Sequence, residues 1–386
     1  MLFVSKIKDL RSDGFGHLEI GHWNLEFGSN QTHAGNMTLS PIIIPIFLPN
    51  AGCPERCLFC NQKAVATETP SPSSVPKFIK ASIMRQPSEK KNREKQIAFY
   101  GGSFTAIPQE DQIDYLKEVQ PFLRSGQIHS IRVSTRPDAL DEEILPMLKE
   151  YGVKTVEIGA QSMIDEVLLL SMRGHTTEDT ISAVSRLRRW SFEVGLHLMI
   201  GLPGDTCDRF LQTLNQVVEL KPDFLRIHPT LVLKGSPLEI LWRTGRYSPL
   251  SLEEAVFCLK KGLLKLERSF IRIARIGLQP TEQLQRHCLA GPYHPALHQL
   301  IDSEIVFDLA KQLLQIYSKE PEPLFLCHPK EVSNLRGQRN RNILRLKDQF
   351  HLKEILIQNR EDIPRGSLFL QTREGSASIR REDLYP

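Results

Sequence analysis

Cys53-Pro54-Glu55-Arg56-Cys57-Leu58-Phe59-Cys60 is the stretch around which this 386-residue chain is organised. Its three cysteines directly follow the apolar run 42–48, which we predict to be a β-strand. A strand that delivers three thiolates to one tight loop can bind three irons of a cubane iron–sulfur cluster, and the fourth iron then stays open for chemistry. A structural zinc site is the alternative, but it needs four ligands. No fourth cysteine or histidine lies close by, and His33 is some distance upstream.

The overall composition is that of an ordinary globular protein, with 40% hydrophobic and 24% charged residues. The length predicts two or three domains, or one large α/β barrel with additions. The net charge of +4 is too small to argue for a nucleic-acid partner, so only the local distribution of charge can indicate one.

The cysteine usage and the absence of targeting signals indicate a compartment. Four further cysteines are scattered through the chain: Cys207, Cys258, Cys288 and Cys327. This pattern favours a metal site in a reducing compartment over a disulfide framework. No apolar run approaches the length of a membrane span, and the N-terminus lacks the pattern of a signal peptide. We therefore predict a cytoplasmic protein with no membrane partner.

Apolar runs alternate with amphipathic stretches from residue 42 onward. The runs lie at 42–48, 96–100, 130–134, 155–159, 193–200 and 224–232, and the stretches near 109–124, 141–151, 177–190 and 207–219. Runs rich in Ile and Val predict parallel strands that are buried on both faces and joined by helical crossovers. Six such units predict an α/β fold, a closed or partial (β/α) barrel. Residues 64–95 interrupt the alternation, and we expect a loop around a short helix there.

Small or polar residues follow every predicted strand. After the cysteine loop they lie at 101–105, 134–138, 159–162, 201–205 and 228–230, with Arg173-Gly174-His175 further on. In parallel α/β barrels the reactive face is formed at the carboxyl ends of the strands. We therefore expect all six segments to converge on one mouth.

The spacing of Cys53, Cys57 and Cys60 after a strand, with Phe59 before the last cysteine, resembles the signature of the radical S-adenosylmethionine (SAM) superfamily. The resemblance covers about residues 40–270, because the motifs at the other strand ends agree in order and spacing. It implies a partial (β/α)6 barrel and a 4Fe-4S cluster whose open iron chelates SAM. It also implies reductive cleavage of SAM to a 5′-deoxyadenosyl radical, which abstracts hydrogen from a substrate.

The same resemblance implies a set of SAM-binding residues: Gly101, Gly102, Ser134, Arg136, Gln161, Arg173 and Gly201. The glycine pair would bind the methionine amino end, because backbone without a Cβ can approach a ligand closely. A tight turn is the structural alternative for that pair and for Gly201. For Arg136 the alternative is a surface salt bridge.

Within the superfamily, the motifs 100–105, 134–138 and 173–176 are most similar to the catalytic subunit of Elongator-type tRNA wobble-uridine enzymes. Oxygen-independent coproporphyrinogen oxidases are similar around residues 155–204. They usually carry a further cysteine where this chain has Gln62, which counts against that assignment. We find no acetyl-CoA loop, so the chain resembles Elongator only in its radical core, like stand-alone bacterial proteins of this type.

The C-terminal part changes in character. Its strand, helix, loop, helix, strand order resembles a KH RNA-binding domain, with Gly337-Gln338-Arg339-Asn340 in place of the GxxG loop. Asn340 replaces the last glycine, and asparagine tolerates the left-handed conformation better than most residues. Six basic residues and one acidic residue give the segment 330–347 a net charge of +5. This is the pattern of a phosphate-binding surface, although a solvated helix face is the alternative.

We accordingly divide the chain into an N-terminal extension 1–38, a radical SAM core 39–270, a barrel extension 271–318 and a small basic KH-like domain 319–386. Translation starting at Met37 would explain the weak pattern before it. The extension contributes a predicted strand with a polar exit at 275–281 and a turn carrying Tyr293 and His294. These two residues, with His197 and His228, are candidate substrate contacts.

Three functions compete. The first is a radical SAM enzyme that modifies RNA, in particular tRNA, through segment 330–347, with flavodoxin or ferredoxin as electron donor. The second is a radical SAM oxidase or transferase that acts on a small molecule. The third is a cluster-bearing sensor without enzymatic activity, which the complete set of SAM-site residues argues against.

Overall fold

The computed structural model describes residues 41–54, 57–62, 69–86, 93–316, 321–373 and 375–384. The predicted N-terminal extension 1–38 and the proposed start at Met37 therefore lie outside the described residues. None of the described helices is both long enough and apolar enough to span a membrane.

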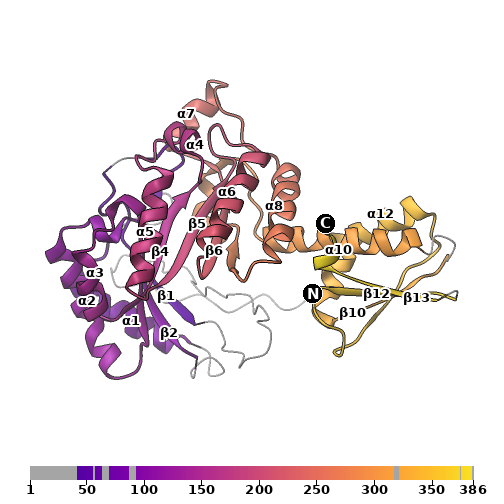
Figure 1. Cartoon of the computed structure of the whole chain (residues 1–386), viewed down its shortest axis with the longest axis horizontal. Coiled ribbons are helices and arrows are strands. Elements are labelled where there is room, and N and C mark those ends of the chain that lie inside the picture. Colours follow the sequence, from indigo (N-terminus) through magenta and orange to yellow (C-terminus); the bar gives the residue numbers. More distant parts are fainter. Residues whose placement is uncertain are drawn as a thin grey trace, which may run out of the picture.

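A seven-stranded sheet forms the centre of the larger part of the molecule, in the order β1-β2-β3-β4-β5-β6-β8 (Figure 1). The strands are β1 (Ile42–Phe47), β2 (Lys95–Tyr100), β3 (Ser130–Thr135), β4 (Val153–Gln161), β5 (Glu193–Ile200), β6 (Phe224–Pro229) and β8 (Arg272–Ile276). All neighbouring strands are parallel. The curled parallel sheet confirms the predicted partial barrel. The strand predicted at 275–281 is added as a seventh, but it lies earlier, at Arg272–Ile276.

Helices pack along the outer side of this sheet (Figure 1). They are α1 (Val75–Met84), α2 (Gln109–Arg124), α3 (Ile144–Glu150), α5 (Thr177–Arg189), α6 (Cys207–Leu220) and α8 (Leu252–Leu266). The short helices α4 (Asp165–Leu170) and α7 (Pro237–Arg243) lie instead beyond one end of the strands, at the top of the view in Figure 1. Two capping boxes begin α5 and α8, from Thr176 with Asp179 and from Ser251 with Glu254. Each box satisfies backbone N–H groups that a helix start leaves without partners.

The two faces of the sheet differ in chemistry. On the outer face, alternate residues such as Val156, Leu196 and Ile227 pack into one large apolar core under the helices. The residues between them turn to the inner face, and several of them are charged, for example Arg132 and Glu157. The strands are buried on both faces, as predicted, but the inner face carries charged residues that the apolar runs did not indicate. The inner face lines a cavity instead of a second helical layer, and the two-residue period of a strand separates the two sets.

Gly195 in β5 leaves room for an aromatic ring from the neighbouring strand. A Cβ atom at this position would lie 2.2 Å from the ring of Phe224 on the next strand. The missing side chain therefore makes the space that the ring fills. The guanidinium groups of Arg132 and Arg272 lie 4.8 and 5.1 Å from the centre of the same ring. A desolvated cation over an aromatic face is stabilised by the ring quadrupole.

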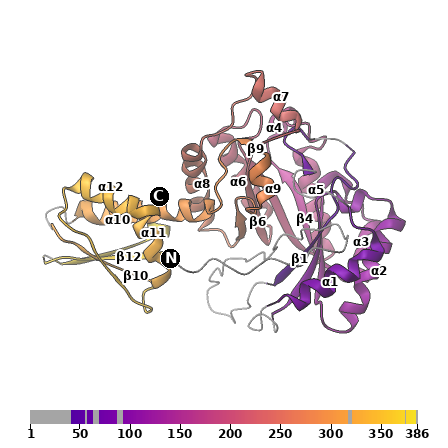
Figure 2. The ribbon, with the colours of Figure 1, turned by 180° about the vertical axis from the view of Figure 1, so that it is seen from behind.

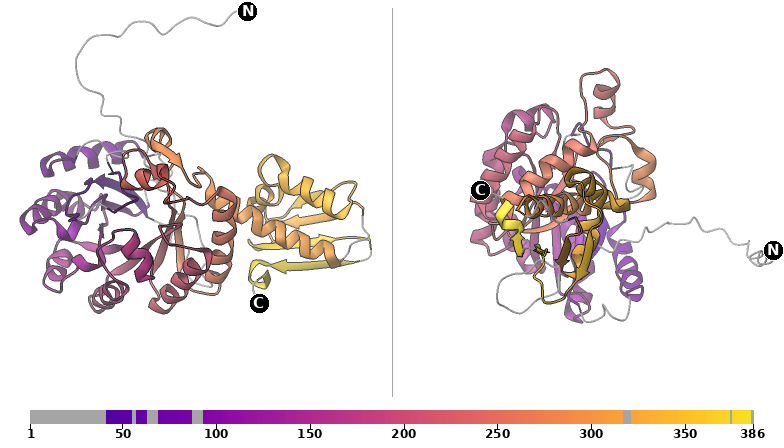
Figure 3. Two further views of the ribbon diagram at one scale, coloured as in Figure 1. Left: turned by 90° about the horizontal axis from the view of Figure 1, so that it is seen from above. Right: turned by 90° about the vertical axis from the view of Figure 1, so that its right-hand side faces the viewer.

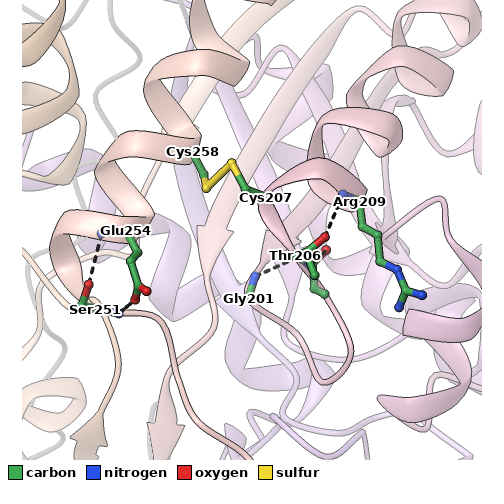
Figure 4. Close-up of a disulfide and its surroundings, with 8 residues drawn as sticks. Gly201, Thr206, Cys207, Arg209, Ser251, Glu254 and Cys258 are labelled. Atoms are coloured by element: carbon green, nitrogen blue, oxygen red, sulfur yellow. Dashed lines mark hydrogen bonds between the residues drawn. A yellow bond between two sulfur atoms is a disulfide. The ribbon is translucent and has the colours of Figure 1, made fainter.

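A disulfide joins α6 to α8, between Cys207 and Cys258 (Figure 4). The sequence favoured a metal site over a disulfide framework, and it did not predict this single bond. The two residues are 51 positions apart, so only the packing of α6 against α8 brings them together. Cys288 and Cys327 are free thiols.

The long helix α10 (Leu297–Ile316) connects the barrel to a second, smaller unit (Figures 2 and 3). Two short strands, β7 (Val232–Leu233) and β9 (Cys288–Ala290), pair with each other, and α9 (Glu282–His287) precedes β9. Residues Leu297, Ile301 and Ile305 of α10 belong to the barrel core, whereas Leu309 and Leu313 belong to the core of the smaller unit. One helix thus contributes to both cores.

The smaller unit is a four-stranded sheet in the order β11-β10-β12-β13. Its elements are β10 (Leu324–Cys327), α11 (Val332–Arg336), α12 (Arg341–Phe350), β11 (Leu356–Asn359), β12 (Ser367–Gln371) and β13 (Ser376–Arg380). The element order up to β11 is the predicted strand, helix, loop, helix, strand. Asn340 in the loop has a φ of 59°, as predicted for the residue that replaces glycine.

Candidate functional site

All seven strands of the large sheet, with the loops that follow them, contribute to one cavity of about 620 Å³. A cavity of this size is typical of a site for a small molecule or cofactor. Nine of the ten predicted site residues line it: Cys53, Cys57, Cys60, Gly101, Gly102, Ser134, Arg136, Gln161 and Arg173. The tenth, Gly201, is not among the lining residues. The expected convergence of strand ends is therefore found for these nine.

Backbone hydrogen bonds hold the cysteine loop from several sides. The N–H of Leu58 donates to the carbonyl of Ser171 (3.1 Å), and the carbonyl of Leu58 accepts from the N–H of Leu238 (2.8 Å). The side chain of Asn61 donates to the carbonyl of Lys234 (2.6 Å). The loop is thereby attached to the residue after α4, to Lys234 before α7 and to Leu238 in the first turn of α7. Its position depends on the barrel as a whole.

The three thiols of the loop influence one another. Burial, together with the neighbouring Cys57 and Cys53, raises the pKa of Cys60 to about 12. Burial and Cys57 also raise the pKa of Cys53. The thiolate is the form that binds metal, and metal binding releases the thiol proton. Three thiols grouped in one loop can therefore bind metal cations as thiolates.

The donor set fits a cluster better than a single ion. Within the part of the chain that the structure describes, no three His, Cys, Asp or Glu side chains are grouped to hold one metal ion. A cubane does not require such a group, because each cysteine binds a different iron at a separate corner. The residues present therefore fit a 4Fe-4S cluster with one iron that no protein residue ligates.

The glycine pair after β2 allows two loops to touch. A Cβ atom on Gly102 would lie 2.1 Å from the carbonyl oxygen of Ala51, directly before the cysteine loop. The next residue, Ser103, donates its N–H to the same carbonyl (2.8 Å). Gly101 has a φ of 103°, which favours glycine. The pair therefore has a structural role in seating the cysteine loop, and both residues also line the cavity.

Arg136 is buried at the cavity wall and forms a two-bonded ion pair with Asp138, with Nε–Oδ1 at 2.9 Å and Nη2–Oδ2 at 2.7 Å. Hydrogen bonding and charge from Arg136 hold the pKa of Asp138 below its ordinary value despite partial burial. The salt bridge considered as the alternative is thus present, but at the cavity wall and not on the open surface.

The side chains of Gln161 and Arg173 both lie close to the backbone of Gly159. Gln161 has a φ of 65°, and the register of β4 against β5 shifts between Ile158 and Gln161. Arg173 donates from Nη2 to the carbonyl of Gly159 (2.8 Å) and from Nη1 to the sulfur of Cys57 (3.0 Å). The carbonyl oxygen of the Gln161 side chain is buried, and it has no hydrogen-bond partner in the described part of the chain. A buried acceptor of this kind is costly unless a ligand or water donates to it, so it fits a site for a hydroxyl group.

Gly201 lies in a turn with its own hydrogen bonds. Its N–H donates to Asp205 Oδ2 (2.9 Å), and its carbonyl accepts from the hydroxyl of Tyr247 (2.6 Å). Its φ is 80°, and an added Cβ would meet Leu250 at 3.0 Å. This is the turn chemistry considered as the alternative for this residue.

Sequence reasoning missed a buried charge network inside the barrel. Glu157 accepts from Arg132 Nη1 (2.7 Å) and from the hydroxyl of Tyr100 (2.6 Å), and it forms an ion pair with Arg226 Nε (2.8 Å). The two arginines lower the pKa of Glu157 to about 2, against the opposing effect of its burial. Tyr100, Glu157 and Arg226 line the cavity. Glu157 and Arg226 lie inside predicted strands, where a single charged residue forms no recognisable motif. Tyr100 ends a predicted strand and begins the motif 100–105.

Two histidines face the same cavity from neighbouring strands. His197 Nε2 and His228 Nδ1 are 2.8 Å apart. Burial, with the positive charge of Arg226, lowers the pKa of His197 to about 4. Burial also lowers the pKa of His228 well below its ordinary value. Of the predicted substrate contacts, these two line the cavity, whereas Tyr293 and His294 do not.

The predicted basic surface lies on α11, α12 and the loop between them. Four of its cations are exposed: Lys330, Arg336, Arg339 and Arg341. Arg345 is different, because its Nη1 lies 2.6 Å from Glu304 of α10 and its guanidinium lies 3.7 Å from the ring centre of Phe307. Arg345 therefore packs α12 on α10 and is less available to a phosphate.

Comparisons with known proteins agree with this geometry. The Radical SAM superfamily model matches residues 47–217, and the Radical_SAM C-terminal domain model matches residues 222–306. The protein YhcC of Escherichia coli is 30% identical over 215 residues, which are 52% of this chain and 67% of that protein. The tRNA uridine(34) acetyltransferase of Methanocaldococcus jannaschii is 36% identical over 127 residues, which are 32% of this chain and 24% of that enzyme.

Among solved structures, the archaeal Elp3 of Methanocaldococcus infernus with an N-terminal deletion aligns with a TM-score of 0.55. It is 21% identical, and the match covers 68% of this chain and 62% of that chain, so it supports the fold alone. This chain spans between 24% and 67% of the length of the curated relatives it matches. The three-cysteine loop, the partial barrel and these matches lead to one conclusion: the chain belongs to the radical SAM superfamily.

Proposed function

We propose that this protein is a radical SAM enzyme that modifies RNA, with tRNA as its substrate. The observation that carries the first half is the convergence of Cys53, Cys57 and Cys60 with the other predicted SAM-site residues on one cavity. The observation that supports the second half is the exposed basic surface beside the loop Gly337–Asn340.

In this proposal the cysteine loop holds a 4Fe-4S cluster and SAM binds beside it. When bound, the two cofactors supply a 5′-deoxyadenosyl radical by one-electron reduction of SAM. Arg173 orients the loop through its contact with the sulfur of Cys57 and offers positive charge at the cofactor. Gln161 accepts a hydrogen bond from the ligand, and Arg136 presents the cationic wall that a carboxylate needs. The aromatic side chains of Phe47 and Phe59 limit the access of water to the cavity.

RNA is the proposed substrate because charge and loop geometry coincide in the smaller unit. Arg339 and Asn340 both adopt left-handed backbone conformations, which turns the chain sharply between α11 and α12. Exposed arginines on either side of such a turn suit phosphates of a nucleic-acid backbone. The named activity of the archaeal relative, a tRNA uridine(34) acetyltransferase, agrees with this choice of substrate.

The parts of the chain take separate roles in this proposal. Residues 39–270 generate the radical, 271–318 extend the barrel, and 319–386 bind RNA. A small reducing protein such as flavodoxin or ferredoxin supplies the electron.

The test combines nucleoside analysis with binding. Mass spectrometry of tRNA nucleosides from cells with and without the gene is expected to reveal one modified nucleoside that depends on the protein. Purified anaerobic protein should retard labelled tRNA in a salt-dependent manner. The variant Arg336→Glu/Arg339→Glu/Arg341→Glu is expected to lose most of this binding, because each phosphate contact contributes through released counterions.

A control variant carries the same change in charge on exposed arginines of the outer helices, Arg85→Glu/Arg124→Glu/Arg189→Glu. It should lose much less affinity. Equal retention of tRNA by both variants would remove the basic surface from the proposal. Unchanged tRNA nucleosides, with a small metabolite that accumulates in the deletion strain, would instead favour a small-molecule substrate.

A further inference from the structure

The cavity has a far side that the cofactor residues do not use. The cysteine loop follows β1, at one edge of the sheet, whereas Arg275 lies on β8, at the other edge. Between them, β5 and β6 contribute His197, Arg226 and His228 to the lining. We call Arg226, His228 and Arg275, with His197, the far side of the cavity.

Arg275 differs from the other arginines of the cavity in its partners. Arg136 is paired with Asp138, Arg226 with Glu157, and Arg173 contacts a cysteine sulfur. Arg275 donates only to backbone carbonyls, from Nε to Gly277 (2.9 Å) and from Nη2 to Leu278 (3.1 Å). Among the described residues, no carboxylate lies within ion-pair distance of it.

These two carbonyl contacts fix the plane of the Arg275 guanidinium and leave Nη1 without a partner among the described residues. Burial, and the positive charge of Arg226 opposite it on β6, lower the pKa of Arg275 to about 10, so it remains charged at neutral pH. A partly buried cation without a counter-ion is costly, and an anion that enters the cavity relieves that cost.

His228 adds a neutral hydrogen-bonding group beside this cation. Arg275 is one of the charges that lower the pKa of His228, so the two groups are near each other. His228 Nδ1 shares a hydrogen bond with His197 Nε2. The Nε2 of His228 is buried and has no hydrogen-bond partner among the described residues. Two neutral imidazoles share one N–H between them. When His197 donates that hydrogen to His228 Nδ1, the Nε2 of His228 carries its own hydrogen and is a donor.

We propose that Arg275 and His228 form a subsite for an oxyanion of the substrate, either a phosphate or a carboxylate. The inference rests on the proposed function only in placing the substrate on the far side of the cavity, beyond SAM. Guanidinium and imidazole N–H groups are the donors that bind such oxygens, and charge-assisted hydrogen bonds are the stronger kind. The subsite therefore selects substrates by charge.

Equilibrium dialysis of the reconstituted, SAM-loaded protein under anaerobic conditions tests this subsite with two matched pairs of probes. Uridine 5′-monophosphate against uridine tests a phosphate, and glutarate against its neutral diamide tests a carboxylate. We expect one anion to bind at least about tenfold more tightly than its neutral counterpart, which is the effect of one charge-assisted interaction.

Arg275→Gln should abolish that preference, Arg275→Lys should restore part of it, and His228→Gln should reduce it. The exposed Arg189→Gln, on an outer helix, should leave it unchanged. The affinity of each variant for SAM shows whether its fold is intact. Where Arg275→Gln fails to fold, the anion preference of His228→Gln is compared with that of the unmodified protein. That comparison then decides whether the subsite binds the anion.

The results separate the two proposals. Preference for uridine 5′-monophosphate that depends on Arg275 supports both the subsite and an RNA substrate. Preference for glutarate alone supports the subsite but contradicts RNA, which contains no carboxylate. Equal binding of each anion and its neutral counterpart, or an unchanged preference in Arg275→Gln, would overturn the subsite.

Discussion

The two sides of the cavity are encoded in different ways. The cofactor side, built around the cysteine loop, consists of residues in the segments that follow strands, such as Cys57 and Arg136. The far side consists of residues inside strands, such as His197 and Arg226. Segments after strands can carry contiguous motifs, whereas an inward-facing strand residue stands alone between apolar neighbours.

The two sides also differ in how their charges are held. On the cofactor side, the cysteine loop is attached by backbone hydrogen bonds, and its arginines touch a carboxylate or a sulfur. On the far side, Glu157 balances Arg132 and Arg226, and no carboxylate among the described residues pairs with Arg275. In the two proposals above, the cluster and SAM complete the cofactor side, and the substrate completes the far side.

Glu157→Gln is expected to give the largest effect on stability. The substitution keeps the size of the side chain but removes the negative charge that Arg132 and Arg226 share. Glu193, at 3.6 Å, is then the more distant acidic partner of Arg132. Removing one partner of a buried ion pair costs about 3–5 kcal/mol of the free energy of unfolding. Urea denaturation measures the change.

A matched control for Glu157→Gln is Glu142→Gln, because Glu142 pairs with Arg189 on the surface, where both side chains are more than half exposed. An exposed pair contributes about 0–1 kcal/mol. Equal losses in the two variants would show that the network of Glu157 does not support the far side.

The histidine pair predicts a second, smaller effect that depends on pH. In the folded protein the pKa of His197 is lowered to about 4, whereas in the unfolded chain it is near its ordinary value of 6.5. Between these values the unfolded state binds more protons, so the free energy of unfolding falls as the pH falls. Between pH 7 and pH 4.5, we expect the free energy of unfolding of His197→Gln to fall by about 2 kcal/mol less than that of the unmodified protein.

Urea midpoints across this pH range measure the difference. A variant that follows the same curve as the unmodified protein would contradict neutral burial of the pair. His129→Gln is the control, because His129 is exposed and its ring lies outside the cavity.

The smallest expected effect is on the cofactor side. Gln161→Ala removes the buried acceptor that has no partner within the described residues. One hydrogen bond to a bound ligand contributes about 1 kcal/mol, so SAM should bind roughly fivefold more weakly. Titration of SAM into the reconstituted protein measures the affinity. Gln120→Ala, on the outer helix α2, should leave it unchanged, and equal affinity in all three proteins would remove Gln161 from the SAM site.

Much of the fold and of the cofactor side followed from the sequence. The alternation of apolar runs and amphipathic stretches predicted the parallel sheet and its outer helices, because each crossover in a parallel sheet needs a helix. The cysteine loop and the residues after β2, β3 and β4 were predicted to converge, because strand ends meet at one edge of a barrel. The left-handed conformation of Asn340 followed from its place in the loop.

The rest depends on contacts between distant segments. Arg132 and Glu157 are single charges inside apolar runs, and only the pairing of β3 with β4 makes them partners. The disulfide between Cys207 and Cys258 depends on α6 packing on α8. Arg345 was counted with the RNA-binding cations, but α10 supplies Glu304 as its partner. No local pattern reports such pairings.

The central claim is that the cysteine loop holds a cluster at which SAM is cleaved. Its most direct test is the release of 5′-deoxyadenosine after the anaerobically reconstituted protein is reduced in the presence of SAM, with bound iron measured in parallel. We predict about four irons per chain, release of 5′-deoxyadenosine, and loss of both in Cys57→Ser but not in Cys288→Ser. A protein that binds no iron, or a Cys57→Ser variant that still releases 5′-deoxyadenosine, would contradict the claim.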